Sequence, residues 1–340
     1  MSQTRRRRFL LAASALLAAP LLAHAQARSR MRTVGQLWNF SSPPPGSPSP
    51  IRARIVDGFK ALGWVEGGNL VIERLYAEFD ASRLPTMAKQ LAGESVDVIW
   101  ASDTASAVAA VHATKRIPIV LAGACAYPVE CGVIKSFARP GGNVTGVAFF
   151  QGIEVQSKLV QFVREVLPTA KRLAWIAIPP DLVTVAGGQF RPERYYREVA
   201  GSLGFELGYF ESSTAADFKP TFRALQSWGA DAVIVEPSPL SGYDAAPQIA
   251  HLALQSHMPS FFNTAYNVKT GGLLSYGPNY FNILDLTVGY VDRILRGARP
   301  SDLPVEMPNR LELVVNQKTA KELGVVIPEL IRAQADRVIQ

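Results

Sequence analysis

The sequence predicts an α/β protein made of two lobes, each with a doubly wound parallel sheet. Short apolar segments typical of buried strands alternate with amphipathic segments of helical periodicity. The same order then starts again: Val98 and Val233 are 135 residues apart, and Ile119 and Phe261 are 142 apart. Such a β–α alternation indicates parallel sheets with helices on both faces. The alternative is one long Rossmann-like sheet.

Predicted elements follow in order along the first half of the chain. Strands are expected at residues 33–38, 70–76, 96–101 and 117–121, and helices at 52–62, 83–93 and 104–113. In the first helix, Ile55, Phe59 and Leu62 have the spacing of one apolar face, and Gly63 ends it.

The second half repeats this order with different residues. Strands are expected at residues 171–178, 205–210, 232–235 and 259–262, and helices at 193–202, 218–227 and 246–256. Gly204 ends a helix as Gly63 does in the first half. Two lobes of similar architecture account for this repetition.

The remaining segments suggest how the chain passes between the lobes. A helix at 281–296 and the stretch 300–308 have no counterpart in the repeat, so we expect them to return to the first lobe. The tail at 311–340, a strand with helices, would cross once more. With linkers at 139–143 and 271–278, the predicted division is residues 1–27 as a signal peptide, 32–147 plus 273–307 as the N-terminal lobe, and 148–272 plus 308–340 as the C-terminal lobe.

The first 27 residues have the pattern of a secretory signal peptide. Four arginines, Arg5–Arg8, precede an uncharged apolar run to Ala23 and small residues around Ala25. A helix of fifteen residues spans only ~22 Å, too short for a ~30 Å hydrocarbon core. The arginines fit twin-arginine export but also serve the general route. We therefore expect a periplasmic protein.

Charge patterning argues against a nucleic-acid partner. The formal net charge is +7, from 35 basic and 28 acidic residues, but four arginines lie in the leader. Without them 31 basic residues face 28 acidic ones, a net charge of +3, and no basic cluster recurs beyond residue 32. No later apolar run approaches eighteen residues, so the mature protein is not expected to span a membrane.

Motifs for catalysis or metal binding are not found in the sequence. The histidines lack metal-ligand spacing, and no nucleophile elbow, phosphate loop or dinucleotide-binding turn occurs. Cys125 and Cys131 either form a disulfide or remain thiols. We expect no enzyme activity, no cofactor and no metal.

Residues that follow the predicted strands are the candidates for ligand binding, because ligands bind at the carboxyl ends of parallel strands. They combine hydroxyl, amide, aromatic and carboxylate groups: Asn39, Phe40, Ser41, Ser102, Asp103, Thr104, Gly123, Tyr127, Glu236, Ser238, Tyr266 and Tyr276.

Several of these residues allow two interpretations. Ser102 and Thr104 open a helix whose positive end attracts a ligand carboxylate, and Asp103 either contacts the ligand or only caps that helix. Glu236 either meets a ligand ammonium or forms a salt bridge at the hinge. The aromatic residues Trp38, Phe40, Tyr127 and Tyr266 either stack on the ligand or pack within the protein.

A set of motifs in fixed order resembles the ABC-transporter substrate-binding protein family that includes the tryptophan/tyrosine-binding TrpX-type proteins. The motifs are GFKALGWVEG at 58–67, IPIV at 117–120, SFARPGGNVTG at 136–146, GGLLSYG at 271–277, RILRGARP at 293–300, and LELVVN with KTAKELG at 311–324. The resemblance covers nearly the whole mature chain. The Thr-x-Ser turn of the family is kept as Thr104 and Ser106, whereas Tyr127 stands where relatives carry an acidic residue.

This resemblance implies a type I periplasmic binding protein with three hinge crossings, in which closure of the lobes captures the ligand. The protein would be the monomeric extracytoplasmic receptor of an importer, with an ABC permease and ATPase as partners. Its ligand would be an aromatic amino acid or another aromatic or carboxylated compound. The alternatives are a periplasmic sensory module that signals to a membrane partner and an exported enzyme on the same scaffold.

Overall fold

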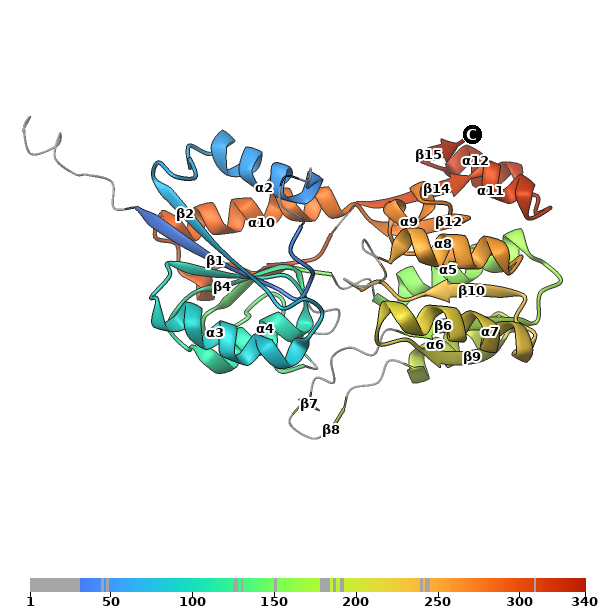
Figure 1. Ribbon diagram of the computed structural model, residues 1–340, viewed down its shortest axis with the longest axis horizontal. Helices are drawn as coiled ribbons and strands as arrows, with labels where there is room; N and C mark the ends of the chain where they lie inside the picture. Colours follow the sequence, from blue (N-terminus) through green and yellow to red (C-terminus); the bar gives the residue numbers. More distant parts are fainter. Residues whose placement is uncertain are drawn as a thin grey trace, which may run out of the picture.

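The computed structural model shows two α/β lobes side by side (Figure 1). It describes residues 31–43, 46, 49–124, 128–129, 131–149, 152–177, 184–185, 188–189, 193–238, 241, 245–308 and 310–340. The predicted signal peptide, Cys125 and Tyr127 therefore lie outside the described residues. In the part that is described, no helix combines the length and apolar character that crossing a bilayer requires.

The first lobe contains a six-stranded parallel sheet in the order β13-β5-β4-β3-β1-β2. Its strands are β1 (Arg32–Trp38), β2 (Leu70–Tyr76), β3 (Val98–Ala101), β4 (Ile119–Ala124), β5 (Val144–Ala148) and β13 (Val305–Glu306). The sheet is wound on both faces, as the sequence predicts.

Helices cover this sheet in two pairs. They are α2 (Pro50–Ala61) and α10 (Tyr280–Leu295) on one face, and α3 (Leu84–Gly93) and α4 (Thr104–Ala113) on the other, with short turns η1 (Ala81–Arg83) and η4 (Pro300–Asp302). Along β3, Trp100 packs with the α2 and α10 side and Ile99 with the α3 and α4 side, because successive side chains of a strand alternate between faces. Both faces of the strand are therefore buried.

The second lobe contains a seven-stranded sheet in the order β15-β14-β12-β11-β10-β6-β9. Its strands are β6 (Arg172–Ala177), β9 (Glu206–Glu211), β10 (Ala232–Val235), β11 (Ser260–Phe262), β12 (Leu274–Pro278), β14 (Leu311–Asn316) and β15 (Arg337–Ile339). The strands run parallel except for the β12–β14 pair. A separate two-stranded element joins β7 (Thr184–Val185) and β8 (Gly188–Gln189).

Helices also cover both faces of the second sheet. They are α5 (Gly152–Val166), α6 (Glu193–Ser202), α11 (Gln317–Glu322) and α12 (Glu329–Gln334) on one face, and α7 (Phe218–Trp228), which follows η2 (Ala215–Asp217), with α8 (Ala246–Gln255) and α9 (Ala265–Lys269) on the other. Trp175 packs toward α5 and α6 and Ile176 toward α7 and α8, which repeats the arrangement of the first lobe. The two-lobed prediction thus describes the molecule, and the single long sheet is wrong.

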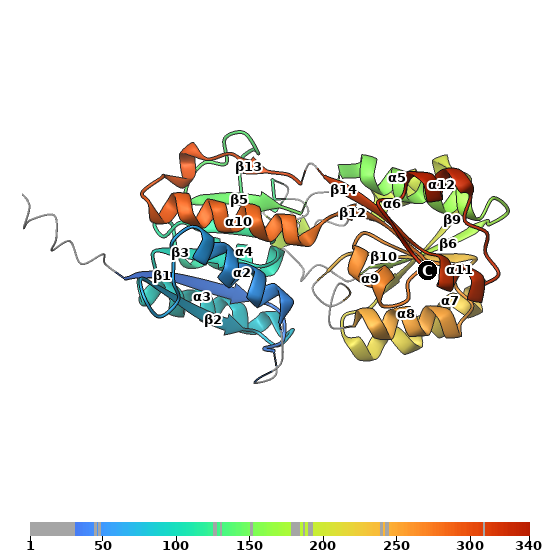
Figure 2. The same cartoon turned by 90° about the horizontal axis from the view of Figure 1, so that it is seen from above.

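Between the described elements, the chain passes from one lobe to the other after β5, between β12 and α10, and between β13 and β14 (Figure 2). The expectation that residues from 273 belong to the first lobe, with a linker at 271–278, is wrong for β12. This strand pairs with β11 and β14 of the second sheet, so the second crossing follows Pro278. Gly271 and Gly272 suggest a linker in the sequence, but a Cβ at Gly272 would clash with the Phe262 ring. Close packing explains this glycine.

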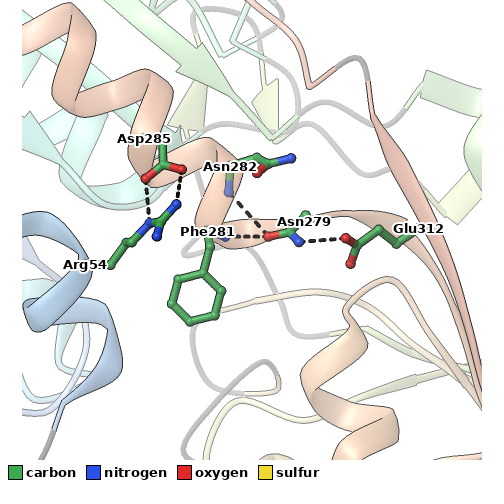
Figure 3. Close-up of polar contacts among 6 residues, drawn as sticks. All are labelled: Arg54, Asn279, Phe281, Asn282, Asp285 and Glu312. Atoms are coloured by element: carbon green, nitrogen blue, oxygen red, sulfur yellow. Dashed lines mark hydrogen bonds and ion pairs between the residues drawn. The ribbon is translucent and has the colours of Figure 1, made fainter. Parts of the chain in front are cut away.

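Asn279 connects the lobes at the second crossing (Figure 3). Its Oδ1 accepts hydrogen bonds from the N–H groups of Phe281 at 2.9 Å and Asn282 at 3.3 Å, which caps α10. Its Nδ2 donates to Oε1 of Glu312 on β14 at 2.7 Å. The side chain thus joins the start of a first-lobe helix to a strand of the second lobe.

We expect Asn279→Ala to lower the free energy of unfolding by about 1–2 kcal/mol, because it removes both the cap and the bond to Glu312. Denaturant unfolding of the purified protein measures this loss. Ser49→Ala is the matched control, since Ser49 caps α2 with one bond to the Arg52 N–H and makes no bond across the crossing. An equal loss in both variants would contradict a contribution from Glu312.

Candidate functional site

The carboxyl ends of the parallel strands lie on the side where the lobes meet. β5 carries the chain out of the first sheet at its carboxyl end, and β12 leaves the second sheet in the same way. Because β3 and β4 run parallel to β5, and β10 and β11 run parallel to β12, their carboxyl ends lie at the same edges. The loops at these edges are the candidate site.

In the first lobe, strand pairing brings Asn39, Ser102 and Asp103 together. Asn39 follows β1, and Ser102 and Asp103 follow the neighbouring strand β3. The Asn39 backbone N–H donates to Ser102 Oγ at 3.4 Å, and its side chain is hydrogen-bonded to the Asp103 carboxyl group. Asn39 and Ser102 are both buried. Three of the predicted site residues therefore form one polar group.

Asp103 is the N-cap of α4. Its Oδ1 accepts the Ser106 N–H at 2.8 Å, and Ser106 Oγ accepts the Asp103 N–H at 2.9 Å, which completes a capping box. Burial raises the pKa of Asp103, and hydrogen bonds from Ser106 and Asn39 oppose that rise. The geometry thus shows the capping role, while ligand contact by Asp103 stays a prediction.

The other described first-lobe residues of the predicted site follow β1 and β3 or lie near the carboxyl end of β4. Phe40 belongs to an aromatic group with Trp38, their ring centroids 5.4 Å apart, while Ser41 continues the loop and Thr104 is the first residue of α4. Gly123 has a φ of +68°, and a Cβ there would lie 2.9 Å from Ile283 Cγ2. It also lies at a register shift between β4 and β5. Backbone conformation and contact with α10 therefore require this glycine.

In the second lobe, Glu236 lies beside an aromatic stack. Tyr196 OH donates to Glu236 Oε1 at 2.7 Å. The Tyr196 ring stacks on Trp175 with centroids 3.9 Å apart and an interplanar angle of 14°. Burial raises the pKa of Glu236 to about 7, and the Tyr196 hydrogen bond opposes part of this rise. No salt bridge of Glu236 is found among the described residues, and the hinge salt bridge considered from the sequence is therefore not seen there.

Two buried acceptors lie next to each other at this edge. Val235 pairs with Phe262, so Glu236 and Asn263 are the following positions on strands about 4.8 Å apart. Glu236 lies on the α6 side of the sheet, where Tyr196 OH reaches it, and Asn263 Nδ2 donates to the Tyr276 carbonyl of β12 at 3.3 Å. Glu236 Oε2 and Asn263 Oδ1 are buried and have no hydrogen-bond partner within the described chain. Together they suit a ligand that carries N–H donors.

A hydroxyl and amide network fixes the loop that carries Glu236. Ser238 and Ser241 hydrogen-bond to each other through backbone N–H groups and hydroxyls, at 2.9 and 3.0 Å. Ser241 Oγ donates to the Glu236 carbonyl at 2.6 Å, and Asn267 Nδ2 donates to the Ser241 carbonyl at 2.9 Å. The predicted site residue Ser238 therefore builds the turn.

Of the predicted tyrosines, Tyr266 and Tyr276 are described, and they lie in different environments. Tyr266 is in α9, directly after the loop of Asn263, and is 38% exposed. Tyr276 is in β12 and packs edge-on against Phe162 of α5, with centroids 5.3 Å apart. Tyr276 is therefore tied to the second-lobe core, whereas Tyr266 is open to solvent beside the candidate site.

Several site residues were missed by sequence reasoning. Tyr196 and Trp175 are in a helix and a strand where aromatic residues are ordinary core residues, and only their packing places them beside Glu236. Asn263 had a sequence signal, because it is a polar residue directly after a buried strand. Over the same described ranges, no three His, Cys, Asp or Glu side chains are grouped closely enough to hold a metal ion.

The two lobes with their facing strand ends define a type I periplasmic binding protein. The chain belongs to the ABC transporter substrate binding protein family, whose model matches residues 47–339. This confirms the family resemblance expected from the motifs.

Relatives share this architecture. A tyrosine-binding protein of Clostridioides difficile (strain R20291) is 26% identical over 261 residues, 77% of this chain and 72% of the relative. A conserved domain protein from Vibrio cholerae O1 biovar El Tor has a TM-score of 0.78 at 27% identity, over 92% of this chain and 100% of its own. An ABC domain from Streptococcus pneumonia in complex with L-Trp has a TM-score of 0.76 at 23% identity, over 91% of this chain and 99% of its own.

Glu236 predicts a pH dependence of stability. Because its pKa in the folded protein is about 7, above its ordinary value of 4.5, the folded state holds this proton more tightly than the unfolded state. Burial of the Glu236 carboxylate therefore lowers the free energy of unfolding. This loss is absent below pH 4.5, grows as the pH rises to 7, and is constant above pH 7. We expect Glu236→Gln to gain about 3 kcal/mol relative to wild type between pH 4.5 and 8, measured by denaturant unfolding. A constant difference over this range would contradict the raised pKa.

Proposed function

We propose that this chain is the extracytoplasmic receptor of an ABC importer and that it captures an aromatic amino acid by closing its lobes. Two buried oxygens without a partner in the described chain, Glu236 Oε2 and Asn263 Oδ1, carry the proposal: their residues follow neighbouring strands, and Glu236 lies beside the Tyr196–Trp175 stack. An ammonium group has three donors, and two buried acceptors on neighbouring strands suit it. The bond between a carboxylate and an ammonium group is strong in such a site because water is excluded.

The first lobe offers complementary groups for the rest of such a ligand. Phe40 is half-buried and belongs to an aromatic group with Trp38, so a ligand ring can pack there. The first turn of α4 directs its N–H groups and its positive dipole end toward the same edge, where a ligand carboxylate is stabilised. The printed names of the relatives, a tyrosine-binding protein and an L-Trp complex, support an aromatic amino acid.

Closure follows from a ligand that contacts both lobes at once. Such a ligand binds the closed arrangement more tightly than the open one and shifts the equilibrium between them. The work of the protein would then be capture and presentation to a membrane permease and its ATPase. Family membership supports these partners, and the signal-peptide pattern of residues 1–27 supports a periplasmic location.

Calorimetric titration with L-tryptophan and L-tyrosine tests the ligand and the role of Glu236. We expect one of them to bind, and indole-3-propionate, which lacks the ammonium group, to bind at least about tenfold more weakly. Affinity for the amino acid should rise about tenfold from pH 6 to pH 8, because the carboxylate form of Glu236 binds the ammonium and its pKa is about 7.

Two variants test whether Glu236 causes these effects. Glu236→Gln should remove both the preference for the ammonium group and the pH dependence, whereas Glu198→Gln, at a salt-bridged residue of α6, should change neither. Equal binding of L-tryptophan and indole-3-propionate by wild type would contradict the proposed contact. Failure of both amino acids to bind would contradict the ligand class.

Cell fractionation tests the location. We expect the mature protein in the periplasmic fraction, with an N-terminus close to residue 27 by mass spectrometry. Replacing Arg5–Arg8 with glutamine should retain the precursor in the cytoplasm, because the basic region of the leader is lost. A full-length chain in the cytoplasmic fraction of wild-type cells would contradict the receptor assignment.

A further inference from the structure

The turn that follows β2 has an unusual backbone. Glu78 and Phe79 are consecutive non-glycine residues with φ values of 57° and 60°, in the left-handed region. This conformation is unfavourable for residues with a Cβ and persists where surrounding contacts impose it. Here the Ala77 N–H donates to the Trp38 carbonyl at 2.8 Å and the Phe79 N–H to the Asn39 carbonyl at 2.9 Å. The turn is thus fixed to the loop after β1 in the first lobe.

The side chain of Phe79 contacts the other lobe. It packs against the second-lobe core cluster that includes Ile176, Phe218 and Phe222. Its ring is also 6.4 Å from the Phe40 ring, centroid to centroid. Phe79 is half-buried. A residue held by first-lobe hydrogen bonds therefore buries apolar surface on the second lobe.

The Phe79 contact lies across the candidate site from the hinge. β2 is the edge strand at one end of the first sheet, whereas β5 and β13, which precede two of the crossings, are at the other end. Figure 2 shows β2 on the same side of the molecule as α8, and β13 and β14 on the opposite side. The hinge and the Phe79 contact therefore lie on either side of the candidate site.

We propose that Phe79 is a positioning residue that holds the lobes together across the candidate site, so that the arrangement described here is populated before a ligand binds. This inference rests on the proposed function only where ligand affinity is concerned. The contact uses protein atoms alone, and burial of a phenylalanine ring against an apolar cluster favours the described arrangement over one in which the lobes are further apart. A protein that closes in part before binding binds its ligand more tightly.

The test compares Phe79→Ala with wild type in two measurements. Small-angle X-ray scattering without added ligand should show a larger radius of gyration for Phe79→Ala, because the lobes separate more often. Titration with L-tryptophan and L-tyrosine should show about tenfold weaker binding, through loss of the closed population. Phe79→Leu should restore both values, since leucine keeps an apolar side chain at the contact.

Phe137→Ala is the matched control, because Phe137 is a half-buried phenylalanine that packs against the first-lobe core. Phe137→Ala should lower the melting temperature and leave the radius of gyration unchanged. Phe79→Ala should increase the radius of gyration and leave the melting temperature nearly unchanged. An unchanged radius of gyration for Phe79→Ala, or a melting temperature lowered as much as in Phe137→Ala, would overturn the proposal. If neither amino acid binds wild type while the scattering difference remains, the proposed ligand fails and the Phe79 contact stands.

Discussion

The direction of the strands at the crossings is the constraint on which this molecule depends. The chain leaves the first sheet at the carboxyl end of β5 and the second sheet at the carboxyl end of β12. Since the neighbouring strands are parallel, every loop at those ends is directed toward the other lobe. The candidate site, the hinge hydrogen bond of Asn279 and the Phe79 contact all follow from this single feature.

Polar groups at the interlobe edge are distributed unequally between the two lobes. In the first lobe, Asp103 is largely satisfied by the capping box of α4 and by Asn39. In the second lobe, Glu236 has one bond from Tyr196, and its other oxygen is buried without a partner in the described chain. An unsatisfied buried acceptor is costly, and the serine and asparagine network around Ser241 holds it in place. The second lobe is therefore the side with unused hydrogen-bonding capacity.

The pattern of apolar residues along the sequence predicted the architecture well because each sheet is buried on both faces. Strands such as β3 and β10 are short continuous apolar runs, and the helices between them carry one apolar face. The β12 assignment failed because Gly271 and Gly272 look like a linker. The close approach of Phe262, on the neighbouring strand β11, is a tertiary contact that the glycine pair itself does not reveal. Among the predicted site residues, Glu236 and Ser102 directly follow strands, and a polar residue at that position is the signal that sequence reasoning can use. Tyr196 and Phe79 act through tertiary packing, which no local pattern encodes.

The return of α10 to the first lobe has a consequence for how the chain acquires its structure. Ile283, Leu284 and Val291 of α10 complete one buried face of the first sheet, against strands that precede them by more than a hundred residues. An N-terminal fragment that ends before residue 280 would leave that apolar face exposed to water. Such a high contact order slows folding, and the N-terminal lobe cannot complete its fold during synthesis until α10 has left the ribosome.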